Sequence, residues 1–396
     1  MNILIAIDKF KGSLTSLEAA HAIKRGIEAA AVATSDAVAK NSYEIVEIAD
    51  GGDGSADILL KVKKGVEIVP VVGVDPLGQE IRSSYLSYYE ADSKCAFIEM
   101  AKISGLELVP HQDFQGRKLR NPIFTTTYGL GQLMRKAYED GAQKITLSIG
   151  GSATNDGGTG MLQALGFKFY DKAGSLITDY MCGGLLSSIG RIETNKSNAP
   201  CLLEVICDVT NPLLGHTGAT YVYGPQKGAD AKMLQQLEAG MENLVTVAGY
   251  SSLSGVGGRG LQAHLLPGAG AAGGVGFAVK AFLNGEIISG WRFFANLIGL
   301  EEKIKEADIV ISGEGKIDDQ SLCGKVVDGV LTLANKYGKK CVLFCGINAL
   351  PEKGSIPNVP IFQLSDIEPN VEKSMQNAAS LLEMLAHQLE KDIQGV

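Results

Sequence analysis

The sequence has 396 residues, a net charge of −8 and 45% apolar residues. This composition excludes a disordered chain, which would carry more charge and fewer apolar side chains. The acidic balance, without any run of lysines and arginines, argues against a nucleic-acid partner and against electrostatic attachment to a membrane. The 49 glycines, about 12% of the chain, exceed the usual share of about 7%.

The sequence also argues against export and against membrane insertion. The apolar run at residues 3–7 is too short for the core of a signal peptide, and no window of 18 apolar residues exists. The seven cysteines form no C-x-x-C pair, which disfavours a zinc ribbon or a disulfide framework. We therefore expect a cytoplasmic protein.

The first 65 residues alternate strand and helix. Residues 3–7 form a continuous apolar run, which is typical of a strand buried on both faces. Thr15 and Glu18 have the spacing of a capping box, and apolar residues at helical spacing follow them. Residues 44–49 predict a second strand, and 56–63 a second helix.

The pattern changes after residue 65 and returns near residue 290. Three strands joined by short turns, at 66–74, 80–88 and 95–100, predict an antiparallel sheet. Further segments are predicted as helix at 128–140 and 159–165 and as strand at 145–149 and 202–207. Beyond 290 we expect strands at 308–312, 341–345 and 360–364 and helices at 325–337 and 374–392.

Both ends of the chain thus carry the same βαβ pattern, and the middle carries a different one. We expect an α/β protein in which residues 1–65 and 291–396 form a doubly wound parallel-sheet domain. A second α/β domain, 66–290, is inserted into it, and the active site is expected in the cleft between the two.

Several glycine-bearing segments follow predicted strands, where open α/β sheets bind their ligands. After the first strand, Lys11 can reach a phosphate or a carboxylate, and Ser13 can bind an anion or cap a helix. The alternative is a plain turn with solvated lysines. After the second strand, Asp50 precedes Gly51 and Gly52, a pattern that suits Mg²⁺ binding, proton abstraction or simply a turn.

The segment 150–160 gives the strongest local signal. Its glycine amides and small hydroxyl side chains make a plausible phosphate cradle, and a long capping loop is the alternative. Asp208 follows another predicted strand, where it could act as a base or a metal ligand, although the Asn-Pro pair after it also starts ordinary turns.

Two further segments partly match nucleotide-binding motifs. Residues 268–273 match G-x-G-x-x-G, but the residues before them make a poor strand, so the context of a dinucleotide site is missing. The pair Gly324-Lys325 lacks the other residues of a P-loop. Residues 312–319 follow a strong strand and concentrate Glu314, Asp318 and other charged side chains. Together, anion-cradling loops, carboxylates and lysines are what phosphoryl transfer requires.

The ordered set of motifs resembles the bacterial type 1 glycerate kinases, which are unrelated to the P-loop kinases. The matching segments run from the N-terminus to past residue 310 and are 8–13, 49–55, 125–129, 150–158, 207–212, 223–228, 268–274 and 313–318. The resemblance implies a flavodoxin-like domain interrupted by a second α/β domain. It also implies ATP-dependent phosphorylation of D-glycerate with Mg²⁺, and we favour 2-phosphoglycerate over 3-phosphoglycerate as the product.

Within this hypothesis each candidate residue receives a role. We expect Lys11 to bind the glycerate carboxylate or the γ-phosphate, and Asp50 or Asp208 to accept the proton of the substrate hydroxyl. Glu314 and Asp318 are expected to hold Mg²⁺. The expected nucleotide-binding residues are Ser13, Gly51, Gly52, Gly150, Gly151, Ser152, Asp156, Gly268, Gly270, Gly273, Gly274 and Lys325.

Two functions from other classes remain as alternatives. One is a nicotinamide-dependent oxidoreductase acting on a small hydroxy acid, which would need a strand before Gly268. The other is a non-catalytic two-domain protein that binds a small molecule. The expected partners are small molecules alone, with the chain acting as a monomer or a homodimer.

Overall fold

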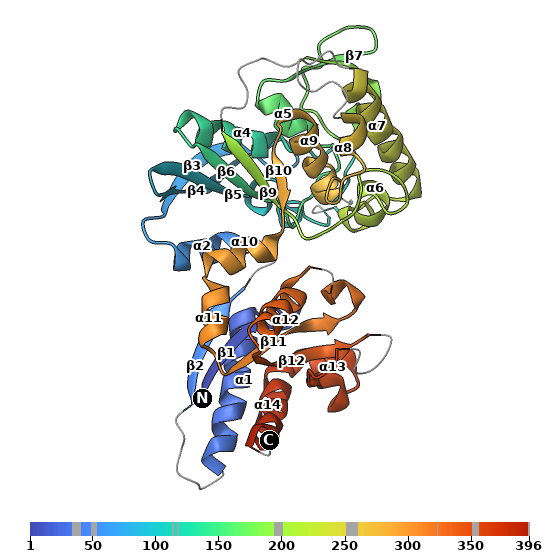
Figure 1. The fold of residues 1–396 in the computed structure, drawn as a ribbon. Helices are drawn as coiled ribbons and strands as arrows, with labels where there is room; N and C mark the ends of the chain where they lie inside the picture. The colour runs from blue at the N-terminus through green and yellow to red at the C-terminus, as the bar shows by residue number, and fades with distance from the viewer. Residues whose placement is uncertain are drawn as a thin grey trace. The chain divides into compact units, whose positions relative to one another are not determined.

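A computed structural model of the chain describes residues 1–33, 41–48, 54–112, 115–116, 119–193, 201–250, 260–322, 324–350 and 356–394. Two compact units make up the fold (Figure 1). Unit 1 contains Met1–Asp50 and Gly290–Val396, and unit 2 contains Gly51–Ser289.

Unit 1 is built on a five-stranded parallel sheet with the order β13-β12-β11-β1-β2. Its strands are β1 (Asn2–Ile7), β2 (Ser42–Glu47), β11 (Ile309–Ile317), β12 (Lys340–Asn348) and β13 (Ile361–Gln363). Counted within the unit, this is the flavodoxin-like order 2-1-3-4-5. The chain moves outward from β1 to β2 and then returns to the other side of β1, so the topology switches direction between β1 and β11. The predicted doubly wound parallel sheet is confirmed.

Helices pack against both faces of this sheet. Helices α1 (Ser16–Ala33) and α14 (Ala378–Gln394) lie side by side (Figure 1) and share one apolar core with Ile3, Ile5 and Ile7 of β1. Helices α11 (Leu300–Glu306) and α12 (Val326–Lys336) also contact β1, and Leu4, which alternates with the isoleucines, is equally buried. Strand β1 is therefore apolar on both faces, which explains its uninterrupted apolar sequence.

Among the helices of unit 1, one predicted feature is confirmed and one predicted helix is wrong. The predicted capping box is confirmed, because the Thr15 amide donates to Glu18 Oε2 (2.9 Å) and the Glu18 amide donates to Thr15 Oγ1 (3.2 Å). The single helix predicted at 374–392 is instead two helices, α13 (Val371–Gln376) and α14. The break lies at Asn377, whose backbone leaves the helical region at φ −108° and ψ 14°.

Unit 2 contains a six-stranded mixed sheet with the order β10-β9-β6-β5-β4-β3. Strands β3 to β5 are antiparallel neighbours, as predicted, and β5, β6, β9 and β10 run parallel. Their bounds are β3 (Glu67–Val74), β4 (Glu80–Glu90), β5 (Ser93–Glu99), β6 (Lys144–Ser148), β9 (Leu202–Ile206) and β10 (Glu286–Ile288). A separate antiparallel pair, β7 (Lys168–Asp171) with β8 (Ile189–Glu193), was not predicted.

The helices of unit 2 form one core with the sheet. The longer ones are α2 (Ser55–Val62), α4 (Tyr128–Glu139), α5 (Thr159–Ala164), α7 (Ala231–Tyr250) and α9 (Val275–Phe282). Apolar residues of α4, α5, α7 and α9 pack with Ile98, Ile145 and Val205 from three neighbouring strands. The predicted domain boundary at 65/66 differs from the unit boundary at 50/51 by helix α2, which contacts β5.

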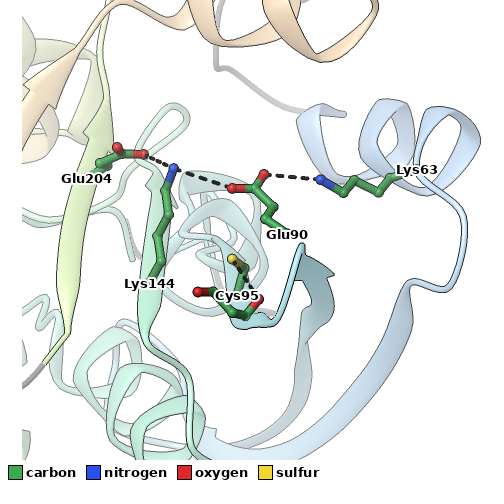
Figure 2. Close-up of polar contacts among 6 residues, drawn as sticks. Lys63, Glu90, Cys95, Lys144 and Glu204 are labelled. Carbon is green, nitrogen blue, oxygen red and sulfur yellow. Dashed lines mark hydrogen bonds and ion pairs between the residues drawn. The ribbon is translucent and has the colours of Figure 1, made fainter.

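Ion pairs cover the amino ends of the parallel strands in unit 2 (Figure 2). Lys144, the first residue of β6, lies 2.9 Å from Glu204 and 3.9 Å from Glu90, and Glu90 also contacts Lys63 (3.1 Å). The Lys63 ammonium lies 4.8 Å from the centre of the Tyr88 ring. Charged side chains at the amino ends of these strands thus pair with one another. The glycine-rich loops follow the carboxyl ends, on the opposite side of the sheet.

Within the described ranges, no helix combines the length and apolarity needed to cross a bilayer. The six cysteines that the structure describes carry free thiols. Cys341 and Cys345 are buried in β12, and burial raises the pKa of each thiol to about 12.

Candidate functional site

Unit 1 contains a cavity of about 390 Å³ at the carboxyl ends of β1, β11 and β12. It includes residues that follow β1 and β11, the two strands between which the topology switches, and in open α/β sheets this is where ligands bind. Four of the predicted site residues line it, namely Lys11, Ser13, Glu314 and Lys325. Residues separated by more than 300 positions in the sequence thus line one cavity.

The loop after β1 is a tight turn held by main-chain hydrogen bonds. The Ser13 and Leu14 amides donate to the Phe10 carbonyl (2.8 and 3.0 Å), and the buried Phe10 ring anchors the turn. Lys11 is exposed at its tip, where Gly12 adopts a φ of +78°. The Ser13 hydroxyl donates to the carbonyl of Met375 (2.5 Å), so it links this loop to α13.

The two predicted metal ligands occupy different surroundings. Glu314 lines the cavity, whereas Asp318 is not among the lining residues and contacts Lys316 at 3.0 Å. Glu314 lies within β11 and Asp318 directly follows it. Because four residues of extended strand span about 13 Å, the backbones of the two acids are far apart. Among the described residues, no cluster of three or more His, Cys, Asp or Glu side chains is arranged to hold a metal ion. Asp8 also lines the cavity, and two carboxylates completed by water and phosphate oxygens suit Mg²⁺.

In unit 2 the candidate residues gather at the carboxyl edge of the sheet. The register places Glu99, Ser148, Ile206 and Ile288 in one row across β5, β6, β9 and β10. Gly150 and Gly151 follow β6, and Asp208 follows β9, so the topology brings these predicted residues to the same edge. Asp208 is half-buried, and its Oδ1 accepts a hydrogen bond from the Ser289 hydroxyl (3.0 Å).

Asp156 organises the loop after β6 from inside. It is completely buried, and its carboxylate accepts hydrogen bonds from the Thr127 amide and hydroxyl (2.8 and 2.7 Å) and from the amides of Gly158 and Gly160. Burial raises the pKa of Asp156, and these four donors oppose that rise. The structure therefore gives Asp156 a positioning role within the loop.

Lys227 extends the same internal network. Its ammonium group is buried and donates to Ser152 Oγ (2.9 Å) and to the Thr154 carbonyl (2.7 Å). Burial lowers the pKa of Lys227 to about 7, against the opposing effect of the nearby Asp156 charge. The predicted Ser152 is thus engaged by a lysine of the same unit, while Gly151 in the same loop is exposed.

The glycines at 268–274 serve close packing. A Cβ at Gly270 would lie 2.2 Å from the Pro212 carbonyl oxygen, and one at Gly273 would lie 2.0 Å from the Thr154 carbonyl oxygen. The amides of Gly270 and Gly274 donate to main-chain carbonyls, at 3.0 and 3.1 Å. Gly268 and Gly274 are likewise buried, with φ values of +83° and +98°. Close packing and positive φ values together account for these glycines.

The context of a dinucleotide motif is absent, as the sequence indicated. Of the residues before Gly268, the structure describes 260–267, which form the short helix α8 (Gly260–Ala263) and turns and contain no strand. The predicted residues Asp50, Gly51 and Gly52 lie outside the described residues. The end of their motif is described: the Gly54 amide donates to Glu99 Oε1 (2.9 Å).

The sequence reasoning did not select three side chains that lie near the candidate residues of their own unit, Asp8 in unit 1 and Glu99 and Lys227 in unit 2. Glu99 is 4% exposed, ends β5 and contacts Lys102 at 3.3 Å. Lys227 is the last residue of the short 3-10 helix η3 (Pro225–Lys227), which Gly224 and Gly228 flank, and Asp8 directly follows β1. The sequence signal that could have identified these three residues was their position at a strand end or between glycines. Their long-range contacts could not be predicted, because the contacting residues lie far away in the sequence.

Comparison with known proteins assigns the family. Residues 3–394 match the model of the glycerate kinase family. The chain belongs to this family. The resemblance found in the sequence is thereby confirmed.

Full-length relatives share this assignment. The chain is 40% identical over 349 residues to the glycerate 2-kinase of Escherichia coli K12, covering 87% of this chain and 85% of that protein. It is 37% identical over 396 residues to the glycerate kinase of Halalkalibacterium halodurans, covering 98% and 97%. A solved structure from Salmonella typhimurium LT2, described as a candidate glycerate kinase 2, aligns with a TM-score of 0.73 and 34% identity over 100% of this chain and 98% of that one.

Proposed function

We propose that this protein is a cytoplasmic glycerate kinase that transfers the γ-phosphoryl group of ATP to D-glycerate, with Mg²⁺, and releases ADP and 2-phosphoglycerate. The observation that carries the proposal is the family match over residues 3–394, together with relatives of nearly equal length. The name of the Escherichia coli relative, a glycerate 2-kinase, favours the 2-hydroxyl as the acceptor.

The chemistry requires a base, cations and a closely held phosphate. Asp208 accepts the proton of the attacking hydroxyl, and its hydrogen bond with Ser289 orients the carboxylate. Asp50 is the alternative base. Lys11, at the tip of an exposed turn, meets the carboxylate or the γ-phosphate with its positive charge.

Mg²⁺ would be held by Glu314 together with Asp8 or Asp318. Bound there, the ion would neutralise the charge that develops on the transferred phosphoryl group. The paired Lys316 and Asp318 make Asp318 the weaker candidate, because the carboxylate would have to exchange its lysine for the metal.

A coupled assay of ADP release tests the proposal directly. ADP release by the wild-type protein must depend on both D-glycerate and Mg²⁺, and ³¹P NMR identifies the phosphorylated hydroxyl. Release without D-glycerate, or NADH formation from D-glycerate and NAD, would refute it. The variants Asp208→Asn and Lys11→Met are expected to lower kcat at least 100-fold. Asp92→Asn, at an exposed turn, is the matched control and is expected to leave kcat unchanged.

A further inference from the structure

The unit 1 cavity has an apolar half that the phosphoryl-transfer chemistry does not explain. Apolar side chains form one wall, and they come from the turn after β1, from η6 (Leu364–Asp366) and from α13 and α14. They are Phe10, Leu364, Pro369, Val371, Met375 and Ala378. The lining also carries charged side chains, which are Asp8, Lys9, Lys11, Glu314, Lys316, Lys325 and Glu368.

Two of these apolar side chains are left exposed. Val371 is 54% exposed and Met375 is 41% exposed, and both lie on the short helix α13 beside the cavity. Exposed apolar side chains that border a cavity mark a binding surface more often than isolated ones do. We therefore expect the apolar part of a bound ligand to cover Val371 and Met375.

The position of Met375 is fixed by the loop that carries Lys11. Ser13 donates its hydroxyl hydrogen to the Met375 carbonyl (2.5 Å), and a Cβ at Gly12 would lie only 3.1 Å from the Met375 methyl carbon. The missing side chain at Gly12 thus makes room for the thioether. The turn that carries Lys11 therefore contacts the apolar wall at Met375, so one ligand can contact both Lys11 and the apolar wall.

We propose that this cavity is the nucleotide site of the kinase, with the heteroaromatic base against Met375, Val371 and Pro369 and the phosphates toward Lys11 and Lys325. This inference rests on the proposed function and adds which substrate the cavity takes. A base offers a flat apolar face, and thioethers pack favourably on aromatic rings. A triphosphate offers several negative charges for the lysines.

Glycerate does not fit the same surroundings. Each of its carbons bears a carboxylate or a hydroxyl group, and burying these against the apolar wall would leave them without hydrogen-bond partners. A cavity of about 390 Å³ lies within the range of small-molecule sites and is far larger than a three-carbon acid fills. The acid substrate therefore binds elsewhere.

Direct binding measurements test the assignment without relying on turnover. Calorimetry with Mg-ADP and with inorganic tripolyphosphate compares a ligand that has a base with one that has none. The variant Met375→Ser is expected to weaken Mg-ADP binding about 10-fold and to leave tripolyphosphate affinity and the KM for D-glycerate unchanged. Lys325→Gln is expected to weaken both ligands. Met384→Ser is the matched control, because Met384 is similarly exposed, at 46%, on α14 and does not line the cavity.

The outcomes separate this inference from the proposed function. Three results for Met375→Ser would each overturn the assignment. They are an unchanged affinity for Mg-ADP, an equal loss of affinity for tripolyphosphate, and a raised KM for D-glycerate with unchanged ADP binding. Binding of Mg-ADP that depends on Met375 supports it even where the wild-type protein fails to phosphorylate D-glycerate. If the protein phosphorylates D-glycerate but substitutions in the cavity do not change its affinity for Mg-ADP, the proposed function stands and this inference is refuted.

Discussion

Lys227 makes the stability of unit 2 depend on pH in a direction that can be measured. Burial lowers the pKa of its ammonium group to about 7, from an ordinary value of 10.5. Between these two values the unfolded chain binds a proton that the folded protein has lost. Since stability rises with pH wherever the unfolded state binds more protons, the free energy of unfolding is expected to increase from pH 7 toward pH 10. Below pH 7 the lysine is charged in both states, and the slope from this group vanishes.

The size of the effect follows from the shift. Each pH unit above the folded pKa adds about 1.4 kcal/mol, and two such units lie between pH 7 and pH 9, so the contribution between pH 6 and pH 9 is roughly 3 kcal/mol. The variant Lys227→Met removes the titrating group, although it leaves Ser152 Oγ and the Thr154 carbonyl without their donor. The difference in unfolding free energy between wild type and variant should therefore widen by roughly 3 kcal/mol in favour of wild type from pH 6 to pH 9.

Urea unfolding followed by circular dichroism at pH 6, 7.5 and 9 measures this difference. Trp291, the single tryptophan, lies in unit 1, so its fluorescence reports the unfolding of that unit separately. Lys232→Met, at an exposed lysine of α7, is the matched control and should show no such widening. A constant difference between wild type and Lys227→Met across this pH range would refute the reasoning. Asp156→Asn removes the negative charge that raises the lysine pKa, so it should move the onset of the slope to lower pH.

Two further predictions concern packing and surface charge in unit 2. Gly273→Ala places a Cβ 2.0 Å from the Thr154 carbonyl oxygen at a φ of +66° and is expected to lower the unfolding free energy by about 3 kcal/mol. Gly141→Ala, at a φ of +87° in open space, should cost about 1 kcal/mol, and equal losses in thermal unfolding would contradict this account. Lys144→Met leaves Glu204, which is 15% exposed, without its lysine and is expected to cost about 2 kcal/mol in urea unfolding. Lys63→Met should cost less than about 1 kcal/mol, since Glu90 is 42% exposed, and the reverse order would refute the argument.

Local signals predicted the elements of unit 1 well. The apolar run at 3–7 and the pair Thr15 and Glu18 predicted a buried strand followed by a capped helix, and both are observed. These features depend on residues close together in the chain. The order of the five strands depends on contacts such as Ile3 with Ile309, for which a single sequence offers no sign.

The candidate site was harder to predict because one pattern serves two purposes. The glycines at 268–274 have a spacing that suits either anion binding or close backbone contact, and only their neighbours Pro212 and Thr154 decide between them. Asp156 stands in a loop of glycines and hydroxyl groups, but two of its hydrogen bonds come from Thr127, 29 residues earlier. Glu99 fell inside the strand predicted at 95–100, and its contact with Gly54 became visible only in the fold.

The insertion of unit 2 between the halves of unit 1 determines the order in which the protein can assemble on the ribosome. The Asn2 amide donates to Asp308, a residue synthesised 306 positions later, so β1 has no β11 to pair with until unit 2 has been made. Domains fold as units during synthesis, and unit 2 is therefore expected to fold first. Throughout that interval β1 presents an apolar strand with an open edge, which is the part of the nascent chain most in need of protection from aggregation.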